Sequence, residues 1–355
     1  MNILMVGPLP PPIGGISVSF HILVDELRRR SDVSIQVVDF SHIRRQSCCA
    51  AVGFITLVHA ILNKAKSCDV ITLSCASTAL PSLGLLLVLL AKWYSKPLII
   101  RKAAGLDYAA IGRIRGAIAH FVVQQVDLYL AQTKALVVLA RQRGLNKVAW
   151  FPTHRPLPDK AKNPVTEATR CRRFVFIGQV REHKGIREIL AAAERFEQDI
   201  QVDIYGPVFQ DIGTDLAGER RHVTYRGVLS QDQVTAVLQQ HDIFLLPSKH
   251  APEGYPGAIV EALAAGLPVI TTRLGGIPEI VDEECGLFVE PGDVNSLYEA
   301  MKKVVEDQEF YRQLLQGVES KRREFDSAVW AGRFVEHCRR LAELESVSGR
   351  SDERS

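Results

Sequence analysis

The sequence has no C-x-x-C pair, and its seven cysteines are odd in number. Both features argue against a disulfide framework or a zinc site and predict a protein of the reducing cytoplasm. Met1 leads directly into a strand-like run, so we expect no signal peptide. The most apolar stretch, residues 83–91, is closed by Lys92 and is far shorter than the ~20 residues of a membrane-spanning helix. It predicts a buried helix, with a shallow membrane-contact helix as the alternative.

Two functional signatures are also missing. The G-x-G-x-x-G spacing of dinucleotide sites does not follow the first strand-like run, which argues against a dinucleotide enzyme. No cluster of metal ligands is visible, so we expect neither a metal ion nor another cofactor.

Charge is distributed unevenly along the chain. Residues 1–163 contain 20 Lys and Arg against 8 Asp and Glu, a net charge of +12, whereas residues 164–355 contain 23 against 32, a net charge of −9. The basic half predicts an anionic partner, which could be a membrane surface, a phosphate-bearing lipid acceptor or nucleic acid. The basic residues are scattered or in short clusters such as Arg28–Arg30, without interleaved aromatic residues. This pattern argues against nucleic acid.

The order of apolar runs predicts an α/β protein with two doubly wound, Rossmann-like domains. In residues 1–151 six strand-like runs alternate with segments of helical character, which is typical of a parallel sheet with right-handed crossovers. The same rhythm resumes at residue 173. Between them, residues 152–173 contain four prolines and no apolar periodicity, so we interpret them as a linker. We assign no role to His154, which lies in this linker.

These patterns predict domains at 1–163 and 164–326. Residues 327–345 are expected to form one amphipathic helix, followed by a disordered polar tail over 346–355.

The most informative segment runs from Glu253 to Glu279. Gly254 and Gly257 loosen its first turn, Pro256 fixes φ near a helix start, and Gly266 is expected to end that helix. An apolar strand and a second glycine turn follow. Glu253 precedes the helix and Glu261 lies about one turn inside it, so both could border one cleft at the carboxyl edge of a sheet.

This segment resembles the E-x7-E signature of the group 1, family 4 glycosyltransferases, which have the GT-B fold. The resemblance implies two Rossmann-like domains facing a central cleft, with the carboxyl-terminal helix crossing back to the first domain. It also implies that Glu253 lies by the donor sugar and Glu261 holds the nucleotide ribose. The backbone at Gly254, Tyr255, Pro256 and Gly257 would contact sugar hydroxyls and phosphate.

Further donor contacts are implied elsewhere by the same resemblance. The loop after residues 173–178 would bind the donor diphosphate through Arg181 and Lys184, although the family's first arginine is replaced by Gln179. Other donor-binding positions are Gly14 and Gly15 after the first strand, Gly206 after another strand, and Val228, whose main chain would hold the base.

The acceptor side departs from the family pattern. Relatives carry a histidine near the reacting sugar where this chain has Ala103 and Ala104. Arg101, Lys102 and Asp107 are the remaining candidates there for contact with the acceptor.

The resemblance implies transfer of a sugar from a nucleotide diphosphate sugar to a glycan or lipid-linked acceptor, with retention at the anomeric carbon. With no metal expected, Arg181, Lys184 and helix N-termini would stabilise the leaving group. The alternatives are a GT-B sugar-nucleotide epimerase and an inactive nucleotide-sugar-binding subunit. The basic first domain suggests bacterial surface-polysaccharide synthesis at the inner face of the plasma membrane, with peripheral contact to anionic lipid.

Overall fold

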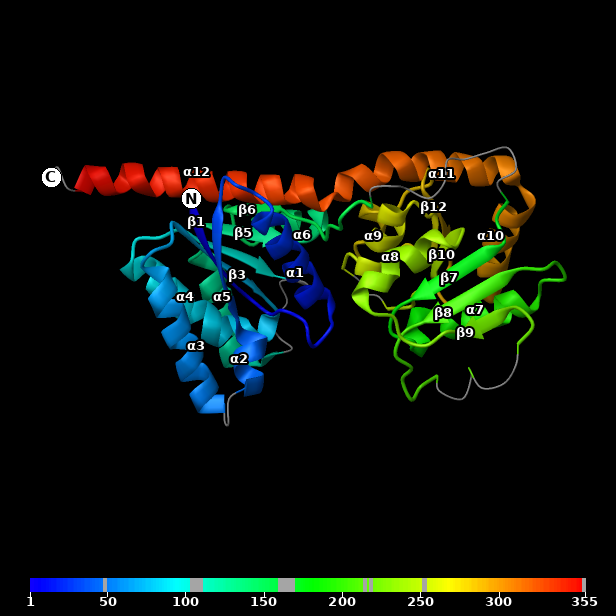
Figure 1. Cartoon of the computed structure of the whole chain (residues 1–355), viewed down its shortest axis with the longest axis horizontal. Helices are drawn as coiled ribbons and strands as arrows, with labels where there is room; N and C mark the ends of the chain where they lie inside the picture. Colours follow the sequence, from blue (N-terminus) through cyan, green and yellow to red (C-terminus); the bar gives the residue numbers. More distant parts are fainter. Residues whose placement is uncertain are drawn as a thin grey trace. The chain divides into compact units, whose positions relative to one another are not determined.

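A computed structural model describes residues 1–46, 50–102, 111–158, 170–212, 216, 220–250 and 254–352, with side chains described except for 44–46, 50 and 346–352. The chain divides into two compact units (Figure 1). The first unit consists of residues 1–154 and 327–355, and the second of residues 155–326. The predicted boundary between residues 163 and 164 lies outside the described residues.

The first unit contains a six-stranded parallel sheet in the order β2-β1-β3-β4-β5-β6. Strands and helices alternate along the chain, as βαβ crossovers require. The elements are β1 (Asn2–Gly7), α1 (Gly15–Arg28), β2 (Ser34–Asp39), α2 (Phe40–Gln46), α3 (Ala50–Ala65), β3 (Val70–Cys75), a 3-10 turn (Ser77–Ala79), a π-helix (Leu80–Gly84), α4 (Leu85–Trp93), β4 (Leu98–Lys102), α5 (Arg113–Gln124), β5 (Leu128–Ala131), α6 (Lys134–Gln142), β6 (Val148–Trp150) and α12 (Ser327–Asp352).

The two faces of this sheet carry separate hydrophobic cores. Alternate residues of a strand point to opposite faces, so Leu4 and Val6 pack under α3, α4, α5 and α6, whereas Ile3 and Met5 pack under α1 and α12. Figure 1 shows α12 on the opposite side of the sheet from α3 and α4. The carboxyl-terminal helix therefore belongs to the first unit, as predicted.

The second unit repeats this architecture with the strand order β12-β11-β10-β7-β8-β9, all parallel. Its elements are β7 (Arg173–Ile177), a 3-10 turn (Glu182–Lys184), α7 (Ile186–Glu194), β8 (Gln201–Tyr205), β9 (Val223–Tyr225), α8 (Gln231–Gln239), β10 (Ile243–Leu246), α9 (Gly257–Ala265), β11 (Val269–Thr272), a 3-10 turn (Ile277–Glu279), β12 (Gly286–Val289), α10 (Val294–Glu306), α11 (Gln308–Arg322) and a 3-10 turn (Arg323–Phe325).

Local residues set two helix ends in the second unit, and the first of them was predicted. Gly266 ends α9 in the left-handed conformation, with φ of 93°, and this is a backbone conformation that glycine adopts at no steric cost. Asp293 caps α10, because its carboxylate accepts hydrogen bonds from the amides of Asn295 and Ser296.

Two local predictions need correction. The tail from Ser346 was predicted to be disordered, but α12 continues to Asp352. No proline interrupts this stretch, and Gly349 costs a helix only about 1 kcal/mol relative to alanine. The apolar run 83–91 is helical, but it is only partly buried. Leu87 is inaccessible to solvent, whereas Leu89 is 60% exposed.

The first residues of the predicted linker are buried in the protein. Thr153, His154 and Arg155 are all buried. The His154 ring packs edge-on against Phe151, with 5.3 Å between ring centroids. Pattern reasoning could not foresee this burial, because it depends on residues distant in sequence.

Candidate functional site

The second unit has a topological switch point between β7 and β10. The chain proceeds from β7 to β8 and β9 on one side, then returns to place β10, β11 and β12 on the other. In open α/β sheets, ligands bind outside the carboxyl ends of the strands at such a point. The loops that follow β7 and β10 are therefore the first place to look for a binding site.

The loop after β7 rests against the end of β10. Gly185 has φ of 83°, and a Cβ at this position would overlap the carbonyl oxygen of Pro247. The Lys249 amide donates to the His183 carbonyl at 2.7 Å, which joins the two loops. Glycine at 185 is thus required both by its backbone conformation and by the close approach.

Gly206, predicted to contact the donor, has a similar structural role after β8. Its φ is 135°, and a Cβ there would overlap the carbonyl oxygen of Gly178. Its amide donates to the Gly227 carbonyl at 2.8 Å, and its own carbonyl accepts from the Tyr225 hydroxyl at 2.9 Å. Val228, which follows Gly227, is 65% exposed.

Two cations occupy the loop after β7. The Arg181 guanidinium lies over the ring of Phe209, 4.3 Å from its centroid. The Arg181 Nε atom is buried, and it has no hydrogen-bond partner among the residues that the structure describes. Lys184 is half-buried at the end of the 3-10 turn and directly precedes Gly185, the N-cap of α7.

The helices of the second unit differ at their N-termini. Asp293 and Asp307 cap α10 and α11, and a capping box formed by Ser230 and Gln233 closes α8. In contrast, α7 and α9 begin without a capping side chain from any described residue. These two helices follow β7 and β10, so uncapped amides are available at the switch point, where they favour an anion.

Glu261 is held in place within the second unit. Its Oε1 atom accepts hydrogen bonds from Arg155 Nε at 2.8 Å and from Gln231 Nε2 at 3.1 Å. The side chains of Arg155 and Glu261 are 5% and 15% exposed. A Cβ at Gly257, one helical turn before Glu261, would overlap the Arg155 guanidinium. A side chain at position 257 would therefore force the Arg155 guanidinium to shift.

Tyr255 fixes the loop before α9 through its side chain. The residue is 4% exposed, its hydroxyl donates to Glu279 Oε2 at 2.5 Å, and its ring packs edge-on against Phe325. The side chain is thus used inside the protein. A ligand at this loop would meet the backbone from Gly254 to Pro256, whereas Glu253 lies outside the described residues.

The described candidates of the first unit lie at the start of α1 and at the end of β4. The Gly14 amide donates to Ser17 Oγ at 3.1 Å at the start of α1, and a Cβ on Gly15 would meet no described atom within 4 Å. Arg101 donates to Ser19 Oγ at 2.5 Å. Lys102 is 1% exposed, and burial lowers its pKa to about 8. Asp107 is outside the described ranges.

Sequence reasoning missed Arg155 and Phe209. Arg155 lies 106 positions before Glu261, and nothing local signals their pairing. Phe209 lies three residues after Gly206, in the loop that follows β8, and its ring packs under Arg181. An aromatic residue in that loop was a weak signal that it could contact Arg181 in the loop after β7.

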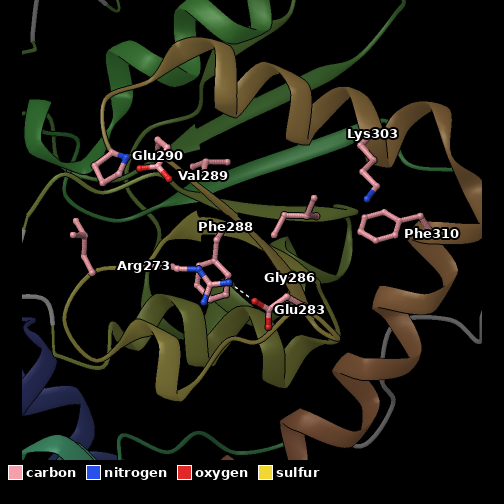
Figure 2. A pocket seen from close by; sticks show the side chains of 11 residues that line it. Arg273, Glu283, Gly286, Phe288, Val289, Glu290, Lys303 and Phe310 are labelled. Atoms are coloured by element: carbon pink, nitrogen blue, oxygen red, sulfur yellow. Dashed lines mark hydrogen bonds and ion pairs between the residues drawn. The ribbon is translucent and has the colours of Figure 1, made fainter.

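A pocket of about 590 Å³ lies elsewhere, along the edge strand β12. Figure 2 shows Arg273 and Glu283 paired on one wall and Lys303 beside Phe310 on another. Because β11 and β10 separate β12 from β7, this pocket is not at the switch point. We do not assign it to the candidate site. Within the described part of the chain, no group of three His, Cys, Asp or Glu residues could hold a metal ion.

A comparison with known protein families finds a match in the second unit. Residues 171–307 match the protein-family model described as Glycosyl transferases group 1. The chain is 27% identical over 208 residues to alpha-maltose-1-phosphate synthase of Mycolicibacterium smegmatis. This match covers 54% of this chain and 52% of that protein. It is 31% identical over 137 residues to amylovoran biosynthesis glycosyltransferase AmsK of Erwinia amylovora, or 35% and 34% of the two chains. The chain thus spans about half or less of these curated relatives.

Solved structures extend the likeness to the whole chain. Alr3699/HepE of Anabaena in complex with UDP matches with a TM-score of 0.74 at 16% identity, covering 96% of this chain and 100% of that one. A second structure of that protein contains UDP-glucose and matches with a TM-score of 0.73. These likenesses show the fold, which is GT-B with two Rossmann-like units. The fold class predicted from the sequence is confirmed.

Proposed function

We propose that this chain, whose residues 171–307 match the group 1 glycosyltransferases, transfers a sugar from a nucleotide diphosphate sugar to a glycan or lipid-linked acceptor. The main support is the arrangement at the switch point of the second unit, where Arg181 and Lys184 accompany the uncapped N-termini of α7 and α9. A diphosphate is the ligand that two cations and free helix amides suit best. The UDP and UDP-glucose bound by Alr3699/HepE support the same donor class.

In the proposed reaction, the bond from the anomeric carbon to the donor phosphate breaks while the acceptor oxygen bonds to the same face. Because the new bond forms on the face that the phosphate leaves, the configuration is retained, as in family 4. The acceptor proton passes to the departing phosphate oxygen. Arg181, Lys184 and the helix amides stabilise the negative charge of the leaving diphosphate. Glu253 orients the donor hydroxyls and responds to positive charge on the oxocarbenium-like sugar.

Further donor contacts are proposed at other residues of the chain. Glu261 holds the ribose through the oxygen that Arg155 and Gln231 do not engage. The backbone from Gly254 to Pro256 contacts the sugar, and the main chain at Val228 contacts the base. Gly14 and Gly15 are further proposed donor contacts. Arg101, Lys102 and Asp107 are the proposed acceptor contacts.

We place this activity in bacterial surface-polysaccharide synthesis, in the cytoplasm at the inner face of the plasma membrane. The relative that acts in amylovoran biosynthesis supports this role. The basic charge of residues 1–163 is the second support, because lipid-linked acceptors carry phosphate.

A thermal-shift panel of UDP-, GDP-, ADP- and dTDP-sugars tests the proposal. We expect one nucleotide class to raise the Tm, because a ligand at ~100 times its Kd adds about 2.7 kcal/mol to the free energy of unfolding. The stabilising donor should then support transfer to a glycan or lipid-linked acceptor. A chain that none of these donors stabilises is not the proposed enzyme.

Product analysis after incubation with the stabilising donor separates the two alternatives. A sugar-nucleotide epimerase would isomerise the donor without any acceptor, whereas an inactive binding subunit would raise the Tm but neither hydrolyse nor transfer the sugar.

Turnover is expected to be unchanged in EDTA, because protein cations and helix amides are proposed to replace a metal ion at the diphosphate. The measurement is the initial rate of transfer before and after chelation. Loss of activity that Mg²⁺ or Mn²⁺ restores would contradict this assignment.

A further inference from the structure

Four helices form a layer over one face of the first-unit sheet. Buried residues of α3, α4, α5 and α6 share one hydrophobic core with Leu4, Val6 and Ile71 of the strands. Neighbouring helices of this layer are also linked at the surface, since Lys92 Nζ donates to Gln125 Oε1 at 2.6 Å between α4 and the end of α5. We call these four helices the helix layer.

The helix layer carries charge of one sign only. The four helices contain six Lys and Arg and neither Asp nor Glu; the six are Lys64, Lys92, Arg113, Arg115, Lys134 and Arg141. The opposite face of the sheet is different, because α1 contains Asp25 and Glu26 and α12 contains three glutamates. A helix layer without a single carboxylate produces an uncompensated positive potential.

The same helices expose large apolar side chains. Trp93 is 82% exposed and lies one turn beyond Leu89, which is 60% exposed, on the outer side of α4. Ile114 on α5 and Ile55 on α3 are 77% and 66% exposed. Further exposed apolar side chains of this layer are Val52, Phe54, Leu62, Phe121 and Val138. Covering such side chains with an apolar phase is energetically favourable.

We propose that the helix layer is a docking surface for an anionic lipid bilayer. Lys and Arg would meet the lipid headgroups, while Trp93, Leu89 and Ile114 would enter the boundary with the acyl chains. Tryptophan is particularly suited to that boundary, because its ring is apolar and its N–H is polar. The inference deepens the proposed function, because it assigns the expected contact with anionic lipid to a specific surface, and it is argued from the first unit alone.

The surface fits lying on a bilayer and not crossing it. α4 has nine residues, or about 14 Å of helix, against about 30 Å of hydrocarbon in a bilayer. Of the helices in the described ranges, none combines the length and the hydropathy of a membrane span.

Other occupants fit this surface less well. A second copy of the same surface would bring cations against cations, which costs several kcal/mol at an interface. Nucleic acid would match the charge, but its interfaces are polar, and exposed Leu89, Ile55 and Ile114 would gain nothing from a phosphate backbone. Anionic lipid satisfies both the charge and the apolar side chains.

Vesicle flotation of the full chain tests the proposal. We expect binding to phosphatidylcholine vesicles that contain phosphatidylglycerol, little binding to pure phosphatidylcholine, and loss of affinity as salt rises. Serine at both Leu89 and Trp93 should weaken binding ~10-fold or more. The matched control is Leu344→Ser, since Leu344 is 62% exposed on α12 of the opposite face.

Tryptophan fluorescence gives an independent reading. The chain has three tryptophans, and Trp330 is 2% exposed whereas Trp93 is 82% exposed. Anionic vesicles should therefore shift the emission to the blue in the wild type but not in Trp93→Phe. That variant keeps an aromatic ring and removes only the reporter.

Several outcomes would overturn the proposal. The first is equal binding to neutral and anionic vesicles, and the second is a Trp93 emission that vesicles do not shift. The third is an equal loss of vesicle affinity in the Leu344→Ser control. The fourth is a dimer in sedimentation velocity that dissociates in the Leu89/Trp93 double variant. Competition of vesicle binding by duplex DNA at equal phosphate would do the same. Because these assays contain neither donor nor acceptor, their failure is distinguishable from failure of the transferase proposal.

Discussion

Replacing Lys184 by alanine is expected to lower kcat for sugar transfer by ~10²-fold or more. Lys184 is half-buried at the end of a 3-10 turn and directly before the N-cap of α7. A fixed cation there acts mainly on charge that develops as the diphosphate departs, so its loss should reduce kcat more than donor binding. The measurement is kcat and KM for the donor identified by thermal shift.

The chain offers a matched control for Lys184. Arg187 lies three residues further on, in the first turn of α7, where it is 49% exposed and pairs with Glu182 at 3.0 Å. Arg187→Ala also removes one positive charge, three residues further along the chain, and we expect turnover near that of the wild type. Lys184→Arg should recover part of the activity. Wild-type turnover in Lys184→Ala, or an equal loss in Arg187→Ala, would refute the assignment.

Arg155→Ala is expected to lower the free energy of unfolding by about 3 kcal/mol, because it leaves the mostly buried carboxylate of Glu261 without its cation. The Arg155 and Glu261 side chains are 5% and 15% exposed, so water replaces the lost partner poorly. Donor KM should rise as well, since Glu261 is the proposed ribose ligand. Thermal or denaturant unfolding and donor titration measure the two effects.

A double-mutant cycle with Gly257 isolates the packing around Arg155. In the wild type, Gly257→Ala should be destabilising, because its Cβ would overlap the Arg155 guanidinium. In the Arg155→Ala background the same substitution should be neutral or favourable, since alanine is the better residue in a helix. The expected coupling is of order 1 kcal/mol or more. Additive effects would show that the two residues do not compete for the same space.

The fold was predictable because its signals are local. The strand-like run Ile3–Val6 is apolar over its whole length, as burial on both faces of a parallel sheet requires. Val269–Thr272 is also buried throughout, and its two threonines are β-branched residues that favour strands. Gly266 and Asp293 marked helix ends for the same reason, because a C-terminal glycine and an N-cap carboxylate act within one turn. These features do not depend on what lies across the fold.

The candidate site was predictable only in part. Its loops contain motif residues, so Arg181, Lys184 and Glu261 could be named in advance, and their catalytic and binding roles remain predictions. The partners could not be named, since Arg155 reaches Glu261 across 106 positions. The burial of Lys102 and His154 was equally invisible, because a charged or polar residue type ordinarily indicates the surface.

The position of α12 also bears on how this protein is made. Trp330, Phe334 and Cys338 fill the same core as Phe20 and Phe151, although residues 155–326 separate them in the chain. A ribosome therefore releases all of the second unit before it releases the side chains that complete the first. The half that is synthesised first must wait, with part of its apolar interior uncovered, until translation has passed residue 338.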